Sequence, residues 1–422
     1  MSPVDTPLGQ VLPRRAASAL AEALTDTRVV SVVGARQCGK STLVRLVAKE
    51  HRAEWRNLDV AVVRQAAITD PTTFVSSAEM LVIDEVQRVP DLMLAIKAEV
   101  DEDPRPGRFL VTGSARVLGL RDLPDALPGR TETIELWPFS QGEIDGGGDG
   151  FVDAVFDGDV HHTGAVDRRE YAERVVRGGF PEAVARTNPT RRQRFFDSYL
   201  GDLIARDVSQ LSDIERPAQM RALVRQIAAR SGQLLVSSAL GADLALGARS
   251  VYRYLGLLEE VFLVKRVPAW SRNVSTRATA TPKVAFVDSG IAANLLGLDA
   301  RALARPGAPL GPLLEAFVLM ELARQLSWSS TRAELYHYRT RDGVEVDAVL
   351  EDRRGRVVGI EVKASSTVRA EDFAGLRHLS SRLGDDFVAG IVLYTGTQTL
   401  PFGPGLRAMP ISSVWEVQAG GA

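Results

Sequence analysis

A short stretch of this chain combines two glycines, a lysine and a serine in a spacing suited to binding phosphate groups. The pattern is Gly34-x-x-x-x-Gly39-Lys40-Ser41, and it lies between a strand-like run of β-branched residues and a helical pattern. The glycines allow the backbone to turn with its N–H groups facing inward, which makes an anion site at the start of a helix. Lys40 would meet the β- and γ-phosphates of a nucleotide, and Ser41 would offer its hydroxyl to Mg²⁺.

The expected nucleotide contacts extend over the whole loop and to one later strand end. An anion-binding nest is built from consecutive backbone N–H groups, so the variable loop positions contribute to it as well as the glycines. The residues expected to contact a nucleotide are Gly34, Ala35, Arg36, Gln37, Cys38, Gly39, Lys40, Ser41, Thr42 and Thr112. The predicted cofactors are therefore ATP and Mg²⁺.

Two adjacent acids supply the groups that phosphoryl transfer needs beside such a loop. The apolar run LVIDEV contains Asp84, expected to hold Mg²⁺, and Glu85, expected to orient or deprotonate the attacking water. The next run, LVTGSA, ends in Thr112 and Ser114, whose hydroxyls would contact the γ-phosphate or simply cap a turn. Arg130 in PGRT is predicted to be an arginine finger that reaches a neighbouring subunit of a homo-oligomer, or else a surface arginine.

Lysine is rare in this chain, which makes its positions informative. Of the 51 basic residues, 45 are arginine and six are lysine, namely Lys40, Lys49, Lys97, Lys265, Lys283 and Lys363. A lysine ammonium is a compact point charge, whereas a guanidinium is a wide planar fork. Lysine at the phosphate loop, and again at Lys363, therefore indicates two sites where a small cation meets anionic oxygen.

Lys363 belongs to a second group of charged residues near the C-terminus. In VEVDAVLEDRRGRVVGIEVKASS, Asp347 ends one strand-like run, and Glu361 and Lys363 lie on the next one. Glu361 and Lys363 point to the same face of a strand, and Asp347 can face them in a hairpin. Two carboxylates ~4 Å apart repel by about 4 kcal/mol at an effective dielectric constant of ~20, and a divalent cation removes that conflict. The metal would activate a water, and Lys363 would stabilise charge on a phosphate.

Several separate motifs resemble those of the prokaryotic AAA+ ATPases that carry a C-terminal domain of unknown function. They are LPRR, GARQCGKSTL, LVIDEVQRVPDL, FLVTGSA, LPGR and LWPFSQGE, followed in order by RGGFPEA, YLGDLIARDV and KVAFVDSGI. The resemblance extends over nearly the whole chain. It implies an ATP-binding module, a helical connector, a winged-helix-like segment and a nuclease-like end.

The C-terminal acids also resemble the core of the PD-(D/E)xK nucleases, a fold that usually begins with a helix bearing an acid. Glu315 in GPLLEAFVLMELARQL matches that position best, and Glu321 is the alternative. The resemblance implies metal ligation by Glu315, Asp347 and Glu361, and catalysis by Asp347, Glu361 and Lys363. Such domains can keep these residues for packing or binding after losing activity, so cleavage is a separate hypothesis.

The order of the patterns predicts an α/β fold class in three parts: a parallel P-loop NTPase sheet, a helical connector with a winged helix, and a restriction-endonuclease-like α/β domain. The predicted domains are an AAA+ P-loop ATPase at 1–144, a flexible insertion with a helical connector or lid at 145–216, a winged-helix-like domain at 217–278 and a nuclease-like domain at 279–422. Flexibility is expected because residues 145–167 are rich in glycine and aspartate.

The winged-helix-like segment carries a cluster of basic residues. Arg249 and Arg253 lie one helical turn apart on the expected recognition helix, LGARSVYRYLGLLEEV, and are followed by Lys265, Arg266, Arg272 and Arg277. Such a cluster would neutralise DNA phosphates. The alternative is a module that only joins domains or binds protein.

Composition predicts a soluble cytoplasmic protein with no membrane partner. The net charge of −2 provides no field over the whole chain that would attract nucleic acid, so a basic surface must be local. The single cysteine excludes an internal disulfide and fits a reducing cytosol. The start of the sequence lacks a signal-peptide pattern, and no apolar stretch reaches the ~18 residues of a membrane span.

These observations lead to one functional hypothesis, one alternative, and a third possibility, a nucleotide-binding signalling switch with very slow turnover. The chain is predicted to be an ATPase with catalytic residues Glu85, Lys40 and Arg130 and with Ser41 and Asp84 as Mg²⁺ ligands. Its nuclease-like domain is predicted to engage nucleic acid, above all DNA, and phosphodiester cleavage is an extension of that hypothesis. The alternative is an ATP-gated regulatory or scaffold protein whose nuclease-like domain is inactive and only binds DNA or protein.

Overall fold

The chain forms two compact units in the computed structural model. The first comprises residues 1–138 with 260–262, and the second comprises 139–259 with 263–422. The finer division into four domains stays a prediction. Within these units the structure describes residues 5–6, 9–76, 79–114, 129–158, 160, 162–208 and 217–418.

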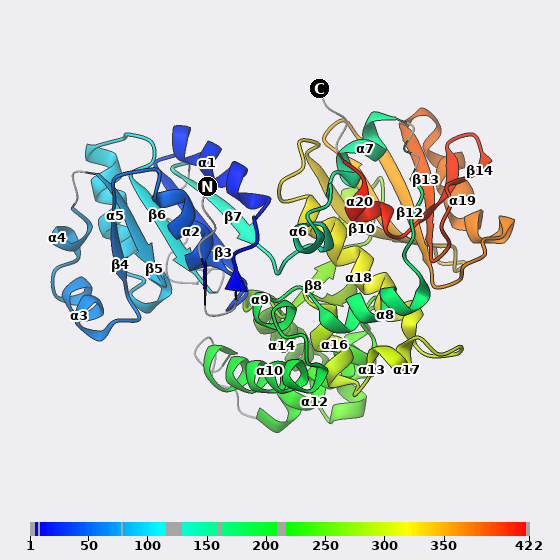
Figure 1. Ribbon diagram of the computed structural model, residues 1–422, viewed down its shortest axis with the longest axis horizontal. Helices are drawn as coiled ribbons and strands as arrows, with labels where there is room; N and C mark the ends of the chain where they lie inside the picture. Colours follow the sequence, from blue (N-terminus) through cyan, green and yellow to red (C-terminus); the bar gives the residue numbers. More distant parts are fainter. Residues whose placement is uncertain are drawn as a thin grey trace. The chain divides into compact units, whose positions relative to one another are not determined.

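A five-stranded parallel sheet forms the centre of the first unit (Figure 1, blue to cyan). Its order is β4-β5-β6-β3-β7, and every neighbouring pair is parallel. The strands are β3 (Val29–Gly34), β4 (Ala53–Asn57), β5 (Met80–Asp84), β6 (Phe109–Gly113) and β7 (Thr131–Leu136). Strands β3, β5 and β6 are buried along their whole length, as their aliphatic runs predict for inner strands of a parallel sheet. The predicted P-loop sheet is confirmed.

Helices connect and cover these strands. An apolar core built from α3, α4, α5 and the sheet contains Leu58, Phe74, Ile83, Met93 and Phe109 among its buried residues. The helices are α1 (Ala16–Asp26), α2 (Lys40–Ala48), α3 (Ala61–Thr69), α4 (Pro71–Val75) and α5 (Leu92–Glu102), with a 3₁₀ turn η1 (Val86–Arg88) and a short strand pair β1 (Asp5–Thr6) and β2 (Gly9–Gln10). Because parallel strands end at the same edge, the loops after β3, β5 and β6 meet there, and such edges hold ligands in open α/β sheets.

The second unit is built on a mixed six-stranded sheet of order β10-β11-β12-β13-β15-β14 (Figure 1, yellow-orange to red). Its strands are β10 (Ala333–Arg339), β11 (Glu345–Asp352), β12 (Val357–Lys363), β13 (Phe387–Tyr394), β14 (Leu400–Gly403) and β15 (Leu406–Pro410). Strands β10, β11 and β12 form an antiparallel meander, whereas β12, β13 and β15 are parallel neighbours. The parallel β12–β13 pair needs a crossover, which α19 (Ala374–Leu383) with the flanking 3₁₀ turns η4 (Ala370–Phe373) and η5 (Gly384–Asp386) provides.

Helix α18 (Leu310–Gln325) is the most deeply buried helix among the described elements of this unit and packs on β12 and β9. It is buried on nearly all sides, which explains why its sequence is apolar all round rather than along one stripe. Its last turn carries the buried polar residues Glu321, Arg324 and Gln325. A buried helix with charged residues must satisfy them internally, so these residues mark a polar junction inside the unit.

The prediction that residues 145–167 form a flexible insertion is wrong in its central part. Residues Phe151–Asp157 form α7, four of whose side chains are buried in the second unit. The glycines before this helix permit close packing, since a Cβ on Gly147 would lie 2.5 Å from the carbonyl oxygen of Trp415 and one on Gly148 would lie 2.2 Å from that of Val417. Glycine here allows backbone to approach backbone, a use that composition does not distinguish from a linker.

Short helices fill the segment between the first unit's sheet and residue 208. They are α6 (Gln141–Asp145), α8 (Arg168–Arg177), α9 (Pro181–Val184), α10 (Pro189–Asp202) and the π-helical segment η3 (Leu203–Val208). Their starts follow local capping chemistry. The Asp167 side chain accepts from the backbone N–H of Glu170 at 2.8 Å, and Ser140 and Glu143 form a reciprocal capping box at the start of α6.

Three helices and one strand occupy the segment expected to be a winged helix, and the second strand of the ribbon lies just beyond residue 278. The helices are α12 (Pro217–Ala229), α13 (Ser237–Leu244) and α14 (Ala248–Glu260), and the strands are β8 (Val264–Val267) and β9 (Lys283–Phe286). Helix α15 (Val274–Thr279) lies between these two strands in the sequence. The remaining described helices of the unit are α16 (Ser289–Leu295), α17 (Ala300–Leu303) and the C-terminal α20 (Ser413–Glu416). Strands β8 and β9 are antiparallel. The order of elements is the expected one, and assignment as a winged helix stays a prediction. Among the described residues, no helix combines the length and apolarity that crossing a membrane requires.

Candidate functional site

The predicted phosphate loop joins β3 to α2 at the carboxyl edge of the first sheet. Gly39 caps α2 with φ of 101°, a left-handed conformation that favours glycine, and Lys40 begins the helix with only 5% of its surface exposed. The Lys40 ammonium donates to the carbonyl oxygens of Gly34 and Ala35, at 3.0 Å each. Both acceptors are uncharged, so they orient the ammonium without neutralising it.

A hydroxyl and a carboxylate meet directly beside this loop. The Ser41 Oγ donates to Asp84 Oδ1 at 3.0 Å, and the buried Thr112 hydroxyl donates to the same oxygen. The three residues follow or end β3, β5 and β6, which are consecutive neighbours in the sheet, so the strand order brings them together. The serine hydroxyl and the aspartate carboxylate are a pair of hard oxygen ligands that Mg²⁺ accepts.

Glu85 occupies an unusual backbone conformation at the same edge. Its φ is 61°, in the left-handed region that non-glycine residues seldom adopt, and its N–H donates to the Thr112 hydroxyl at 3.1 Å. The side-chain amide of Gln87 donates to the Glu85 carboxylate and, at 2.9 Å, to the Ser114 hydroxyl. Strained residues of this kind concentrate at functional sites, where the surrounding contacts hold them. Sequence reasoning missed Gln87, although it lies two residues after Glu85 in LVIDEVQ.

Arg14 is a second residue that sequence reasoning missed. Its guanidinium donates to the carbonyl oxygen of Cys38 in the phosphate loop at 2.8 Å and to that of Trp137, just after β7, at 2.6 Å. A Cβ on Gly34 would lie 2.1 Å from the carbonyl oxygen of Leu136, so the loop also packs tightly on the end of β7. Arg14 belongs to the LPRR motif, one of the motifs that carry the family resemblance, and that motif was the available signal.

Arg130 lies at the opposite end of the sheet from the phosphate loop. It immediately precedes β7, whose Thr131 pairs with Val29 at the start of β3. Its Nε forms an ion pair with Asp101 Oδ1 at 2.7 Å. It therefore does not reach the nucleotide site of its own chain, and a role in a neighbouring subunit stays a prediction.

The four predicted nuclease residues lie together in the second unit. Glu315 from α18, Asp347 from β11, and Glu361 and Lys363 from β12 line one open pocket of about 630 Å³. The β11–β12 register pairs Ala348 with Ile360, which places Asp347 across from Glu361. The hairpin geometry expected from the sequence is therefore present.

The predicted metal site needs a correction, because a lysine ammonium sits among these carboxylates. Lys283 at the start of β9 is 1% exposed, and its Nζ lies 2.6 Å from Glu315 Oε1, 2.9 Å from Asp347 Oδ1 and 3.0 Å from Glu345 Oε1. The second oxygen of Asp347 accepts from the N–H of Val362 at 3.0 Å. Among the described residues, no group of three or more metal-binding side chains is arranged to hold an ion. The residues present therefore do not fit Mg²⁺.

Burial governs the protonation of this cluster. The pKa of Glu315 is raised to about 8 by burial and by the neighbouring Asp347 charge, and that of Glu361 is raised to about 7 for the same two reasons. Burial alone would lower the pKa of Lys283, but the surrounding carboxylates outweigh it and raise that pKa well above its usual value. The lysine therefore keeps its charge within the cluster, whereas burial favours the protonated form of the two glutamates.

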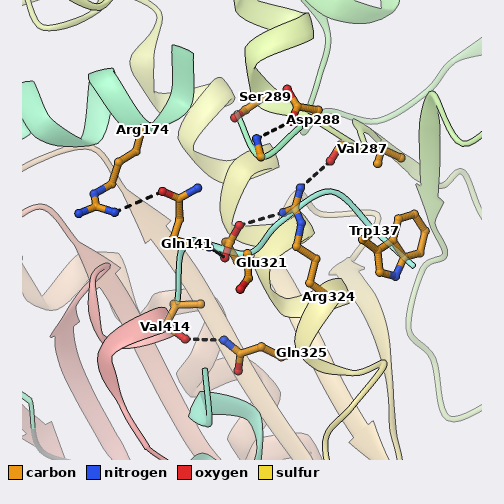
Figure 2. A network of polar contacts seen from close by, with 12 residues as sticks. Trp137, Gln141, Arg174, Val287, Asp288, Ser289, Glu321, Arg324, Gln325 and Val414 are labelled. Atoms are coloured by element: carbon orange, nitrogen blue, oxygen red, sulfur yellow. Dashed lines mark hydrogen bonds and ion pairs between the residues drawn. The ribbon is translucent and has the colours of Figure 1, made fainter. Parts of the chain in front are cut away.

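Glu321, the alternative helix acid, lies in a separate polar network (Figure 2). It is 1% exposed, pairs with Arg324 at 2.9 Å, and accepts from the backbone N–H of Gln141 at 2.9 Å. Burial raises its pKa to about 7. The neighbouring Gln325 accepts from the N–H of Val152 at 3.1 Å and donates to the carbonyl oxygen of Val414. The last turn of α18 therefore joins three distant segments of the second unit, and Glu321 is structural.

The basic cluster of the middle segment is divided between paired and unpaired residues. Arg266, Arg272 and Arg277 form ion pairs at 2.5, 2.8 and 2.6 Å with Glu259, Asp386 and Glu351, respectively, so their charge is already compensated. Arg249 and Arg253 are exposed on α14, and within the described part of the chain neither has an ion pair. The expected phosphate-binding set is therefore narrower than the sequence indicates.

Comparison with known proteins locates three families along the chain. Residues 26–145 match an AAA domain, residues 168–302 match a domain of unknown function, DUF8612, and residues 310–414 match another, DUF4143. The solved structure of a Walker-type ATPase from Pyrococcus abyssi is 15% identical, covers 68% of this chain and 96% of its own, and has a TM-score of 0.43, at which the likeness carries no argument.

Two curated relatives match over most of their length. The uncharacterized proteins Rv2008c of Mycobacterium tuberculosis and Mb2031c of Mycobacterium bovis are each 30% identical over 406 residues, which cover 95% of this chain and 84% of the relative. This chain therefore belongs to the family of these mycobacterial proteins, and in it an N-terminal AAA domain of the P-loop ATPases precedes two domains of unknown function.

Proposed function

We propose that the chain binds ATP at the loop from Gly34 to Thr42 and hydrolyses it. The observation that carries this proposal is the Lys40 ammonium, which is buried and directed by two neutral carbonyl oxygens rather than by a carboxylate. A buried cation without a counter-ion is costly, and a bound phosphate would supply the missing negative charge. The family match to an AAA domain over residues 26–145 supports the same reading.

The remaining residues divide the work of phosphoryl transfer. Ser41 and Asp84 would hold Mg²⁺, which neutralises phosphate charge when bound. The carboxylate of Glu85 would accept the proton of the attacking water, and its hydrogen bond from Gln87 holds it in place. Thr112 fixes both acids, since its hydroxyl donates to Asp84 and accepts from the N–H of Glu85.

Phosphate release from ATP tests this proposal. Glu85→Gln should lower the turnover rate by about 10²- to 10⁴-fold, the usual contribution of a general base, while ATP binding stays within a few-fold. Glu102→Gln, at the exposed end of α5, removes an acid from the same unit and should change neither quantity. Equal rates for native and Glu85→Gln chains would exclude Glu85 as the base.

For the second unit we propose nucleic-acid binding through α14. Residues 217–283 contain ten lysines and arginines against three acids, in a chain whose net charge is −2. On α14, Arg249 and Arg253 are exposed, and the Tyr252 ring between them is 62% exposed. Two arginines beside an exposed aromatic ring offer phosphate contacts and a stacking surface.

Binding of a random-sequence DNA duplex at several salt concentrations tests this surface. The double variant Arg249→Ala/Arg253→Ala should reduce the slope of log K against log salt by about 2, one unit for each lost phosphate contact. Arg301→Ala/Arg305→Ala, a pair with the same spacing in the same unit, serves as the matched control and should leave the slope unchanged. If the native chain does not bind DNA or RNA, the module joins domains or binds protein instead.

We propose further that this engagement occurs without phosphodiester cleavage. The competing hypothesis, metal-dependent cleavage by Asp347, Glu361 and Lys363, is less well supported because Lys283 occupies the carboxylate cluster. The function proposed is therefore an ATP-dependent binding protein with a non-cleaving nuclease-like domain. If the native chain nicked a plasmid with Mg²⁺ or Mn²⁺ and Asp347→Ala did not, the cleavage hypothesis would be favoured over binding without cleavage.

A further inference from the structure

The Lys283 ammonium is surrounded by acidic partners drawn from two separate elements. A lysine ammonium has three protons to donate, and Lys283 has three carboxylate partners, Glu315 on α18 and Glu345 and Asp347 on β11. The ammonium donates to Glu315 and Asp347 at 2.6 and 2.9 Å, the distances of charge-assisted hydrogen bonds, and forms an ion pair with Glu345 at 3.0 Å. The Lys283 side chain is 1% exposed, so water has little access to the ammonium.

These contacts use the oxygens that a metal ion would need. Mg²⁺ binds oxygen at about 2.0–2.1 Å, and Glu315 Oε1 and Asp347 Oδ1 are both directed at the lysine. The other Asp347 oxygen is taken by the N–H of Val362. An ion sharing these oxygens would lie within ~4 Å of the ammonium, where even unit charges repel by about 4 kcal/mol at an effective dielectric constant of ~20.

The remaining acid of the pocket does not restore a metal site. One oxygen of Glu361 accepts from Lys363 at 2.7 Å, and its other oxygen is buried without a hydrogen-bond partner among the described residues. A carboxylate oxygen beside two ammonium groups is a poor ligand for a divalent cation, which prefers several oxygen ligands.

We propose that Lys283 is the resident cation of this acidic cluster, so that the native chain binds no divalent metal ion there. The lysine joins β9 to α18 and β11 as a metal ion would, but it does so covalently attached to the chain. Removing it would leave three carboxylates around a position sized for a cation, which a divalent ion could then fill.

Binding of Mn²⁺, followed by electron paramagnetic resonance in the absence of nucleotide, tests this proposal without depending on catalysis. The native chain should show no Mn²⁺ site that Asp347→Asn removes. Lys283→Met should gain one site, at least about 10-fold tighter than any native binding, because the carboxylate set of two or three oxygens becomes free. Adding Asp347→Asn to that variant should abolish the gain.

Lys363→Met is the matched control, since it removes an equal charge from the same pocket and leaves Lys283 in place. It should gain no Mn²⁺ site. An equal gain in both variants, or no gain in a folded Lys283→Met chain, would overturn the proposal. A native Mn²⁺ site that is lost in Asp347→Asn and kept in Asp84→Asn would also overturn it, and this last measurement decides even if Lys283→Met does not fold.

Discussion

Two buried lysines, Lys40 in the first unit and Lys283 in the second, meet opposite kinds of oxygen. Lys40 is 5% exposed and donates hydrogen bonds to two uncharged carbonyl oxygens, whereas Lys283 is 1% exposed and forms ion pairs with three carboxylates. The charge of Lys40 remains available to a bound anion, whereas the charge of Lys283 is compensated by carboxylates of the protein itself. Two lysines of similar burial therefore indicate different roles, and their partners distinguish these roles. Lys40 indicates a ligand site, whereas Lys283 with Glu315, Glu345 and Asp347 forms an internal ion-pair cluster, called the clasp below.

The largest expected effect concerns the clasp. Lys283→Met should lower the free energy of unfolding by about 3–5 kcal/mol, because it leaves buried carboxylates without a counter-ion. ATP binding by the folded fraction should not change. Urea denaturation followed by circular dichroism measures the loss, and a change below about 1 kcal/mol would show that the clasp is not a stabilising contact.

Two aspartates, Asp84 at the end of β5 and Asp347 near the start of β11, should separate activity from stability. Asp84→Asn should reduce ATP turnover by about 100-fold, equivalent to ~2.7 kcal/mol, since it removes the proposed Mg²⁺ ligand. Asp347→Asn should instead cost about 1–3 kcal/mol of stability through a lost partner for Lys283, with turnover unchanged. Phosphate release and urea denaturation of both variants measure these two effects. If both variants lost turnover alike, or stability alike, the distinction between the two sites would be wrong.

A smaller effect is expected when charge is kept and shape is changed at the phosphate loop. Lys40→Arg should weaken ATP binding by about 10- to 100-fold, because a guanidinium fork does not replace a compact ammonium. Lys49→Arg, at the exposed end of the same helix, should have no effect. Fluorescent-nucleotide titration compares them, and undiminished binding by Lys40→Arg would mean that charge alone is recognised.

The smallest effect should come from Lys363. Its side chain is 33% exposed and pairs with one carboxylate, Glu361. Lys363→Met should therefore change the free energy of unfolding by less than about 1 kcal/mol, as for other partly solvated ion pairs. A loss as large as that of Lys283→Met in the same urea measurement would mean that both lysines form one clasp.

The phosphate site was predicted more completely from the sequence than the C-terminal site, because most of its residues are close together in the sequence. The loop and its helix start are contiguous, and the apolar runs ending in Asp84 and Thr112 identify strand ends that a parallel sheet must bring together. Arg14 was missed because it bonds the backbone carbonyls of Cys38 and Trp137, which are distant in sequence. Gln87 was missed because no spacing pattern marks an amide that bonds the Glu85 carboxylate and the Ser114 hydroxyl.

At the C-terminal site the hairpin and the convergence of the acids were predicted, but the occupant was not. Lys283 lies outside the hairpin, on the ribbon strand β9, so only the tertiary fold brings it to Asp347. The rarity of lysine that drew attention to Lys363 applied equally to Lys283. The glycine-rich segment failed for a related reason, since Gly147 and Gly148 are set by packing on the C-terminal residues rather than by their neighbours in sequence.

The most direct test of the account is calorimetric titration of MgATP into the native chain and into Lys40→Met. The account predicts one ATP bound per native chain and at least ~30-fold weaker binding by the variant, since truncating one partner of a buried charge pair costs about 2–5 kcal/mol. No binding by the native chain, or equal binding by both, would contradict it.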